Sequence, residues 1–442
     1  MNIFRIALKA VLESLTKPAM FAVIGLILMS SNVFSEAEQA QQKQSPQLDD
    51  GNSFVLINAR LFTASGLIAP AAVRVENGII TELGQEVAPD PSLPVINING
   101  QTVTPGLIDA HTHTSFDSQL LDSLRFGVTA QLDMSTGVSF MQEQREQRSE
   151  LEETEYADLY SAGMIVTSPG GHGTQNGSTI PTVDSPSKAK QHIRARLDEG
   201  SDWIKIAYEP DNAFLSSVDK PTLAALIAAA HEQDSLAVVH VSKLEAARDA
   251  VEAGADGLVH IFADKVVDEE LLTLMQARKV FVIPTLSVIA SIVGKDNAEH
   301  WAFEQTGSLR LSRGQKNTLA ASFNTYPGQE KFFKLDVAYE NTRRMKAANI
   351  AILVGSDAPN SGTAHGVSTH DELVHFINAG FTPAEALQSA TSIPSKIFKL
   401  EDRGILEVGR RADLVVFDGK PDKNILDTRK ISRIYKNGYE FE

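Results

Sequence analysis

Short apolar runs alternate with helical patterns over most of this chain, and that alternation limits the choice of fold more than any other feature. Helical patterns such as Pro221–Gln233 and Lys243–Ala253 separate most of the runs. The eight runs are Leu107–Ala110, Val128–Leu132, Leu159–Val166, Trp203–Ile206, Ala237–Val241, Gly257–Ile261, Val280–Ile283 and Ile350–Val354. Strands that alternate with helices form parallel βα units, and eight such units close a barrel. We therefore predict an α/β fold of the (β/α)8 or TIM-barrel type.

Two β-rich segments flank this alternating region. Phe54–Gly84 and Ala412–Gly438 contain short β-branched runs, and each includes an Asn-Gly pair, which is a strong hairpin signal. We predict a small β-sandwich domain built from both chain ends, residues 53–103 and 403–442, beside a barrel domain of residues 104–402. The long polar stretch Ser291–Asn349 breaks the rhythm, and we expect helices and an elaborated loop there.

The N-terminal residues have the order of a secretory signal peptide. Basic residues precede the uncharged stretch Ala19–Ser31, and Val33-Phe34-Ser35 then offers small residues at a cleavage site. We predict a signal peptide over residues 1–35 and a flexible tether over residues 36–52, which is rich in Gln, Ser and acids. The mature chain is then expected in the periplasm or outside the cell, free of the membrane. An uncleaved membrane anchor is the alternative.

Composition excludes several classes of function. The formal net charge of -16 argues against a nucleic-acid partner, because a polyanion is repelled by it. The absence of cysteine excludes disulfides, thiolate metal ligands and thiol nucleophiles. A hydrophobic content of 43% is that of an ordinary globular protein. We expect a small-molecule substrate as the partner, and a homo-oligomer remains open.

Metal-binding side chains follow the predicted strands. His111 and His113 end the first strand, His240 and His260 end the fifth and sixth, and Asp357 follows the eighth. Side chains two apart on a strand share a face, so one ion can take both members of the His-x-His pair. Each residue alone has a plain alternative, such as a core histidine or a helix-capping aspartate. Because TIM-barrel sites are built at the carboxyl ends of strands, the set together favours a metal site, with zinc as the first candidate.

Lys205 lies between Ile204 and Ile206 in the predicted fourth strand. Burying a charged lysine is costly, and burial lowers the pKa of its amine. The neutral amine can react with carbon dioxide to give a carbamate, N6-carboxylysine, whose two anionic oxygens can bridge two metal ions. The alternative is a lysine that reaches solvent from the strand end.

These motifs resemble those of a known family, the amidohydrolase superfamily, over residues from about Phe54 to Tyr439. Within it, the chain is most similar to the imidazolonepropionase-like and Xaa-Pro dipeptidase (prolidase)-like branch. The matching segments are Val103–His113 (first-strand signature), Gly170–Gly173 (glycine–histidine loop after the third strand), Asp202–Ile206 (carboxylated-lysine strand), Gly355–Pro359 (last-strand aspartate) and Gly404–Val416 (closing signature).

The resemblance implies a binuclear metal-dependent hydrolase that cleaves an amide or peptide-like carbon–nitrogen bond, such as a dipeptidase or cyclic amidase. It implies one divalent ion on His111, His113, Lys205 and Asp357, and a second on Lys205, His240 and His260. A hydroxide that bridges the ions would attack the carbonyl carbon, and Asp357 would pass the proton to the leaving nitrogen.

Three other functions remain open. A lactone or phosphotriester hydrolase could use the same metal pair. A mononuclear deaminase of the same superfamily would not need Lys205 and would want a glutamate close to the fifth strand, whereas the first one after His240 is Glu245. A non-catalytic binding protein on a decayed barrel should have lost at least one ligand, and none is missing.

Candidate substrate contacts rest on position alone. His172 lies in the glycine-rich loop, and Tyr208 and His365 follow the fourth and eighth strands. A structural or surface role is the alternative for each. Arg125 is a candidate for binding a substrate carboxylate only because it follows the first strand in sequence.

Overall fold

The computed structural model of the chain describes residues 52–177, 179–295, 311–321 and 333–442. The predicted signal peptide and nearly all of the predicted tether lie outside these residues, so both stay predictions. In the described part of the chain, no helix is both long enough and apolar enough to cross a lipid bilayer.

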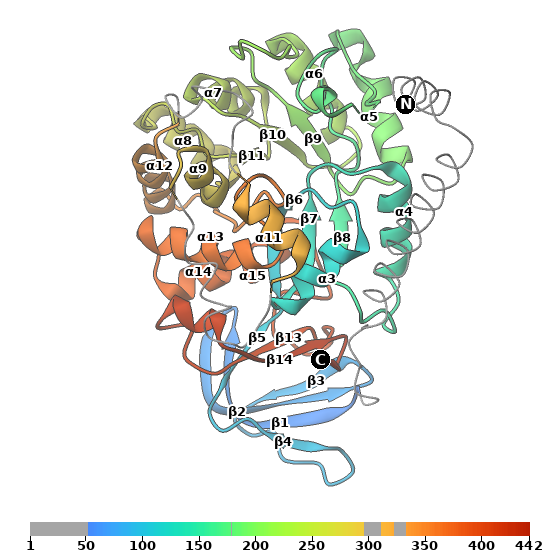
Figure 1. Ribbon diagram of the computed structural model, residues 1–442, viewed down its shortest axis with the longest axis vertical. Helices are drawn as coiled ribbons and strands as arrows, with labels where there is room; N and C mark the ends of the chain where they lie inside the picture. The colour runs from blue at the N-terminus through green and yellow to red at the C-terminus, as the bar shows by residue number, and fades with distance from the viewer. Residues whose placement is uncertain (1–51, 178, 296–310, 322–332) are drawn as a thin grey trace, which may run out of the picture. The chain divides into compact units, whose positions relative to one another are not determined.

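Parallel strands occupy the first seven predicted runs, which confirms the α/β prediction. They form a three-stranded sheet in the order β6-β7-β8 and a four-stranded sheet in the order β12-β11-β10-β9. The strands are β6 (Leu107–Thr112), β7 (Val128–Asp133), β8 (Asp158–Ser161), β9 (Ile204–Ala207), β10 (Ala237–His240), β11 (Gly257–Val259) and β12 (Phe281–Ile283). Figure 1 shows these strands in the middle of this part of the molecule, with helices around them.

The eighth predicted run, Ile350–Val354, forms no regular strand. Ile352 makes one isolated parallel bridge with Val282, and Val166 makes another with Ile206, between the two sheets. The backbone amide of Val354 donates to the carbonyl of Ser389, at 2.9 Å. That amide is therefore not available to a ladder with β6. The structure thus shows two parallel sheets connected by bridges, in place of one continuous eight-stranded sheet.

The helices follow the strands as predicted. In α6, the Asp219 side chain caps the N-terminus by accepting from the Thr222 amide at 2.9 Å, and Leu223, Leu226 and Ile227 are buried. The helices are α3 (Asp117–Arg125), α4 (Val138–Gln147), α5 (Ala189–Asp198), α6 (Lys220–His231), α7 (Leu244–Ala253), α8 (Glu269–Arg278), α9 (Leu286–Ile292), α11 (Arg313–Ala320), α12 (Leu335–Ala347), α13 (Val367–Asn378), α14 (Pro383–Ser389) and α15 (Ser392–Ile397). Helices α11 and α12 confirm the prediction for Ser291–Asn349 where it is described, and residues 296–310 and 322–332 lie outside the described residues.

Strands from both chain ends share a single eight-stranded sheet, seen below the parallel strands in Figure 1. Strand β5 pairs antiparallel with β13, so the predicted pairing of the two ends is confirmed. Asn77 and Gly78 both have positive φ, 52° and 77°, in the tight turn between β2 and β3 that their sequence predicts. The residue boundaries of the two predicted domains stay predictions. The strands are β1 (Phe54–Thr63), β2 (Gly66–Glu76), β3 (Ile79–Gly84), β4 (Val95–Asn97), β5 (Thr102–Pro105), β13 (Leu414–Phe417), β14 (Ile431–Lys436) and β15 (Tyr439–Phe441).

Candidate active site

A cavity of about 630 Å3 lies at the carboxyl ends of the parallel strands. Its walls include five of the predicted metal ligands, His113, Lys205, His240, His260 and Asp357. Cavities of this volume suit small molecules. The structure therefore brings residues from five different parts of the chain to one pocket of small-molecule size.

The tightest group of ligand atoms joins His111 in β6, and His113 just after it, to Asp357. Asp357 Oδ1 lies 3.3 Å from His111 Nε2 and 3.2 Å from His113 Nε2. His111 is fully buried, and neither its Nε2 nor Asp357 Oδ1 has a hydrogen-bond partner within the described residues. Buried polar atoms without partners are costly, and a divalent cation between them would satisfy both. The three side chains thus fit a metal ion.

The pKa values of the site residues also favour the binding of a metal ion. Burial, and then the nearby Lys205, lower the pKa of His111 to about 3. Burial and then His172 lower the pKa of His240 to about 4. Burial by itself raises the pKa of Asp357, but the histidines around it hold that pKa well below its ordinary value. Near neutral pH the imidazoles of His111 and His240 are therefore neutral and the Asp357 carboxylate is ionised, which are the forms that bind metal ions. The pKa of His113 is raised instead, because the adjacent Asp357 carboxylate outweighs the effect of burial.

Lys205 lies in β9 beside the histidine-bearing strand β10. It is only 2% exposed, and it pairs in register with Val238, two residues before His240. Because side chains alternate along strands, Lys205 and His240 lie on the same face. Burial lowers the pKa of the Lys205 amine to about 7, against the opposing charges of Asp357 and Asp133. Near pH 7 a substantial share of this amine is therefore unprotonated, which is the form that can react as a nucleophile.

His260 is oriented by a residue that follows β12. Its Nδ1 lies 2.5 Å from Thr285 Oγ1, so a proton on Nδ1 leaves Nε2 free to bind a metal ion. Thr285 has a left-handed φ of 51°, which is rare for a β-branched residue. The buried Glu372 carboxylate accepts from the amides of Leu286 and Ser287 at 2.8 and 2.7 Å, which anchors the turn that starts α9. The backbone strain therefore lies where His260 is positioned.

Asp109 connects the two segments that bear the tightest ligand group. Its Oδ1 accepts from the backbone amides of His111 and Ser356, at 3.2 and 2.9 Å. A Cβ atom on Gly355 would lie 2.8 Å from His111 Cβ, so only glycine lets this segment pass so close to β6. Asp109 and Gly355 thus hold Asp357 beside the His-x-His pair.

The three predicted substrate contacts differ in whether they line the cavity. His172 lines the cavity, and its ring centroid lies 4.4 Å from that of His240. Tyr208 and His365 are buried at 2% and 3% exposure and are not among the cavity walls. The Tyr208 hydroxyl donates to Asp249 in α7 at 2.8 Å, and His365 Nδ1 lies 3.3 Å from Gln131 Nε2. Contacts between these residues and substrate stay predictions, and the geometry favours only His172.

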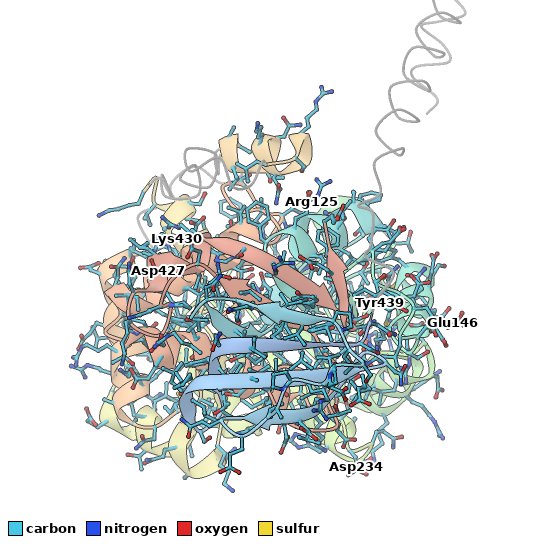
Figure 2. All side chains as sticks on the ribbon, turned by 90° about the horizontal axis from the view of Figure 1, so that it is seen from below. Arg125, Glu146, Asp234, Asp427, Lys430 and Tyr439 are labelled. Atoms are coloured by element: carbon cyan, nitrogen blue, oxygen red, sulfur yellow. The ribbon has the colours of Figure 1, made fainter. Side chains whose placement is uncertain are left out.

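Arg125 does not line the cavity. It is the last residue of α3. Figure 2 shows it on the side of the molecule that carries the eight-stranded sheet built from both chain ends. A helix that returns from a strand end brings its own C-terminus to the opposite end of the strands. The geometry therefore does not favour Arg125 as a contact for a substrate carboxylate, and that suggestion stays a prediction.

Glu209 is a cavity residue that the sequence analysis missed. Its Oε2 lies 3.5 Å from His172 Nδ1 and its Oε1 lies 3.5 Å from His240 Nε2. The ligand atoms of these three residues lie within 4.8 Å of one another. Side chains alternate along a strand, so positions 205, 207 and 209 point to the same face. Extending this alternation from Lys205 would have predicted Glu209 on the side of the site.

Imidazoles and an ionised carboxylate at strand ends, around a cavity of small-molecule size, are the parts expected of a metal-dependent enzyme that acts on small molecules. The sequence pattern of the amidohydrolase family matches residues 102–439. The chain belongs to the amidohydrolase family, and it is a hydrolase of the class that acts on carbon–nitrogen bonds. The predicted similarity to imidazolonepropionase-like and prolidase-like proteins is also confirmed.

Individual relatives are distant. An imidazolonepropionase of Streptomyces griseus subsp. griseus is 23% identical over 364 residues, which cover 80% of this chain and 87% of that protein. A solved structure of a Xaa-Pro dipeptidase with bound methionine has a TM-score of 0.69 at 18% identity, covering 88% of this chain and 100% of that one. A molinate hydrolase structure has a TM-score of 0.70 at 18% identity and covers 89% and 95% of the two chains. At this identity the structural likeness shows the fold alone.

Proposed function

We propose that this chain is a binuclear metal-dependent hydrolase that cleaves an amide or peptide-like carbon–nitrogen bond in a small substrate. The observation that carries the proposal is the pair of buried, unpartnered ligand atoms, His111 Nε2 and Asp357 Oδ1, at 3.3 Å from each other. A divalent cation would satisfy both atoms, and they lie beside a cavity of about 630 Å3 that can hold the substrate.

We also propose that the two parallel sheets and the eighth run close into one barrel. The support comes from parallel bridges at the sheet edges, Val166 with Ile206, Val282 with Ile352 and Thr112 with Ala358. A closed barrel directs the carboxyl ends of all its strands to one mouth, where the cavity lies.

Six side chains are available to hold two divalent ions. His111, His113 and Asp357 would hold one, His240 and His260 the other, and Lys205, as its carbamate, would contribute to both. Zinc suits this set of imidazole and carboxylate donors. When bound, such ions supply a lowered pKa for water and a positive charge beside the carbonyl oxygen of the scissile bond.

Asp357 is the residue of this chain that can move the proton. Its carboxylate is ionised, Oδ1 faces the His-x-His pair, and Oδ2 lies 3.8 Å from His260 Nδ1. It can therefore accept a proton as water adds to the carbonyl carbon and donate it to the nitrogen as the carbon–nitrogen bond breaks. Ile165, Val288 and Ile289 form apolar parts of the wall that can bind the substrate and exclude water.

The proposal predicts metal-dependent hydrolysis of carbon–nitrogen bonds. We expect the protein to release amine from at least one compound in a panel of dipeptides, N-acyl amino acids and cyclic ureides. Dialysis against a chelator should abolish this activity and added zinc should restore it, because the ligand residues alone cannot activate water. Amine release can be measured by mass spectrometry of the products. Activity that survives complete metal removal, or activity only on lactones or phosphotriesters, would contradict the proposal.

A further inference from the structure

Glu209 presents a carboxylate whose two oxygens are each shared between a neutral donor and an imidazole. Its Oε1 accepts from Ser242 Oγ at 2.9 Å and lies 3.5 Å from His240 Nε2. Its Oε2 accepts from Asn212 Nδ2 at 3.3 Å and lies 3.5 Å from His172 Nδ1. The Glu209 side chain is 13% exposed, so little water competes for these contacts. One partly buried side chain therefore connects the loops after β9 and β10 to the glycine-rich loop.

These contacts determine which nitrogen of His240 remains available. A histidine that binds a metal ion through one nitrogen usually donates its other N–H to a carboxylate or carbonyl, and this partner fixes the tautomer and the ring orientation. For His240 the nitrogen that faces the carboxylate is Nε2, so Nδ1 remains for an ion. For His260 the nitrogen that faces its partner, Thr285, is Nδ1. The two histidines are thus held through opposite nitrogens.

We propose that Glu209 is a positioning residue that holds His240 with its proton on Nε2 and thereby sets the affinity of the second metal ion. This inference rests on the proposed function in taking His240 as a ligand of that ion. Through its other oxygen, Glu209 holds His172 Nδ1, which leaves His172 Nε2 available to the cavity. The metal ligand and the residue best placed to contact substrate are therefore oriented by the same carboxylate.

Metal-buffered titration of full-length variants tests the effect on affinity. In Glu209→Ala, the second zinc ion should bind about 10- to 100-fold more weakly, the usual loss when the carboxylate partner of a ligating histidine is removed. The first ion should bind as before. Asp211→Asn is a matched control, since it removes one acid from the same loop and its side chain is 67% exposed. Unchanged binding of the second ion in Glu209→Ala would overturn the proposal.

A loss of affinity in both variants would mean that loop charge, and not the contact with His240, sets the binding, which also overturns it. Three zinc ions in the wild type and two in Glu209→Ala would make Glu209 itself a ligand and would overturn the positioning role.

The protonated nitrogen of His240 can be observed without any metal ion. In metal-free protein labelled with 15N-histidine, NMR should show the His240 proton on Nε2, and this preference should be lost in Glu209→Ala. A His240→Gln variant assigns the signal. A wild-type proton on Nδ1 would overturn the proposal even if two ions bind. Conversely, a proton on Nε2 in a protein that binds only one ion would support the positioning role and count against the binuclear function.

Discussion

Lys205→Ala should lower kcat/KM on the order of 10³-fold or more and should reduce the zinc content, chiefly at the second site. The reason is that a carbamate on Lys205 would provide an anion to both ions, and a shortened side chain cannot form it. Losing a metal ion removes several kcal/mol of stabilisation of the transition state, and each 1.36 kcal/mol is about tenfold in rate. Steady-state kinetics and elemental analysis of the same preparations give both numbers.

The matched control for this change is Lys220→Ala. Lys220 begins α6, is 50% exposed and pairs with Asp249 and Glu252 at 2.6 and 2.8 Å. Exposed pairs of this kind contribute about 1 kcal/mol or less, so this variant should keep full activity. A short carboxylic acid in the buffer should restore part of the activity of Lys205→Ala by replacing the carbamate. Normal turnover and two ions in Lys205→Ala would show that the lysine has no part in the site.

Asp357→Asn should lower kcat by about 10²- to 10⁴-fold, the range that a positioned general acid and base contributes. The amide has the size of the carboxylate, but it cannot take up the proton that must reach the leaving nitrogen. The negative charge next to His111 and His113 is also lost, so the first ion should bind more weakly. Kinetics at saturating zinc separates the two effects, because a rate that zinc cannot restore reports the proton transfer.

Thermal unfolding of Asp357→Asn serves as its control. The backbone there is tied to β6 by the Asp357 amide, which donates to the His111 carbonyl at 2.8 Å, and the substitution leaves that bond in place. We therefore expect an intact fold. A folded Asp357→Asn with activity within tenfold of wild type would exclude Asp357 as the proton carrier.

The rule that function lies at the ends of parallel strands could be applied to the sequence, and it found most of the site. It predicted the His-x-His pair, His240 and Asp357 as neighbours. The structure brings His113, His240 and Asp357 to one cavity, with buried His111 3.3 Å from Asp357. The rule works because parallel strands place their carboxyl ends together whatever the loops do. It needs only the strand boundaries, and short apolar runs give those well.

Which side chains point into the cavity was less well predicted, although the sequence contained part of this information. Lys205 faces the site, so Tyr208, three residues later, has the opposite parity and points to α7, where it meets Asp249. Glu209 has the parity of Lys205 and enters the cavity. His365 lies in a loop without strand register, and its burial against Gln131 depends on packing that no local pattern reveals.

The irregular eighth run also could not be predicted from its own residues. Its apolar sequence is that of a strand, but the amides of Val354 and Ile108 donate to the carbonyls of Ser389 and Ala390, at 2.9 and 2.7 Å. Those carbonyls come from a segment more than thirty residues later in the chain. A sequence pattern reports local preference, whereas this interruption arises from a long-range contact.

The number of metal ions per chain tests the central claim most directly. Protein purified without chelator, in buffer with bicarbonate to maintain the carbamate, can be measured by elemental analysis against its concentration from amino-acid analysis. We expect about two divalent ions per chain, mainly zinc, at full activity. A reproducible value of one or less, in preparations with full activity, would contradict the binuclear site.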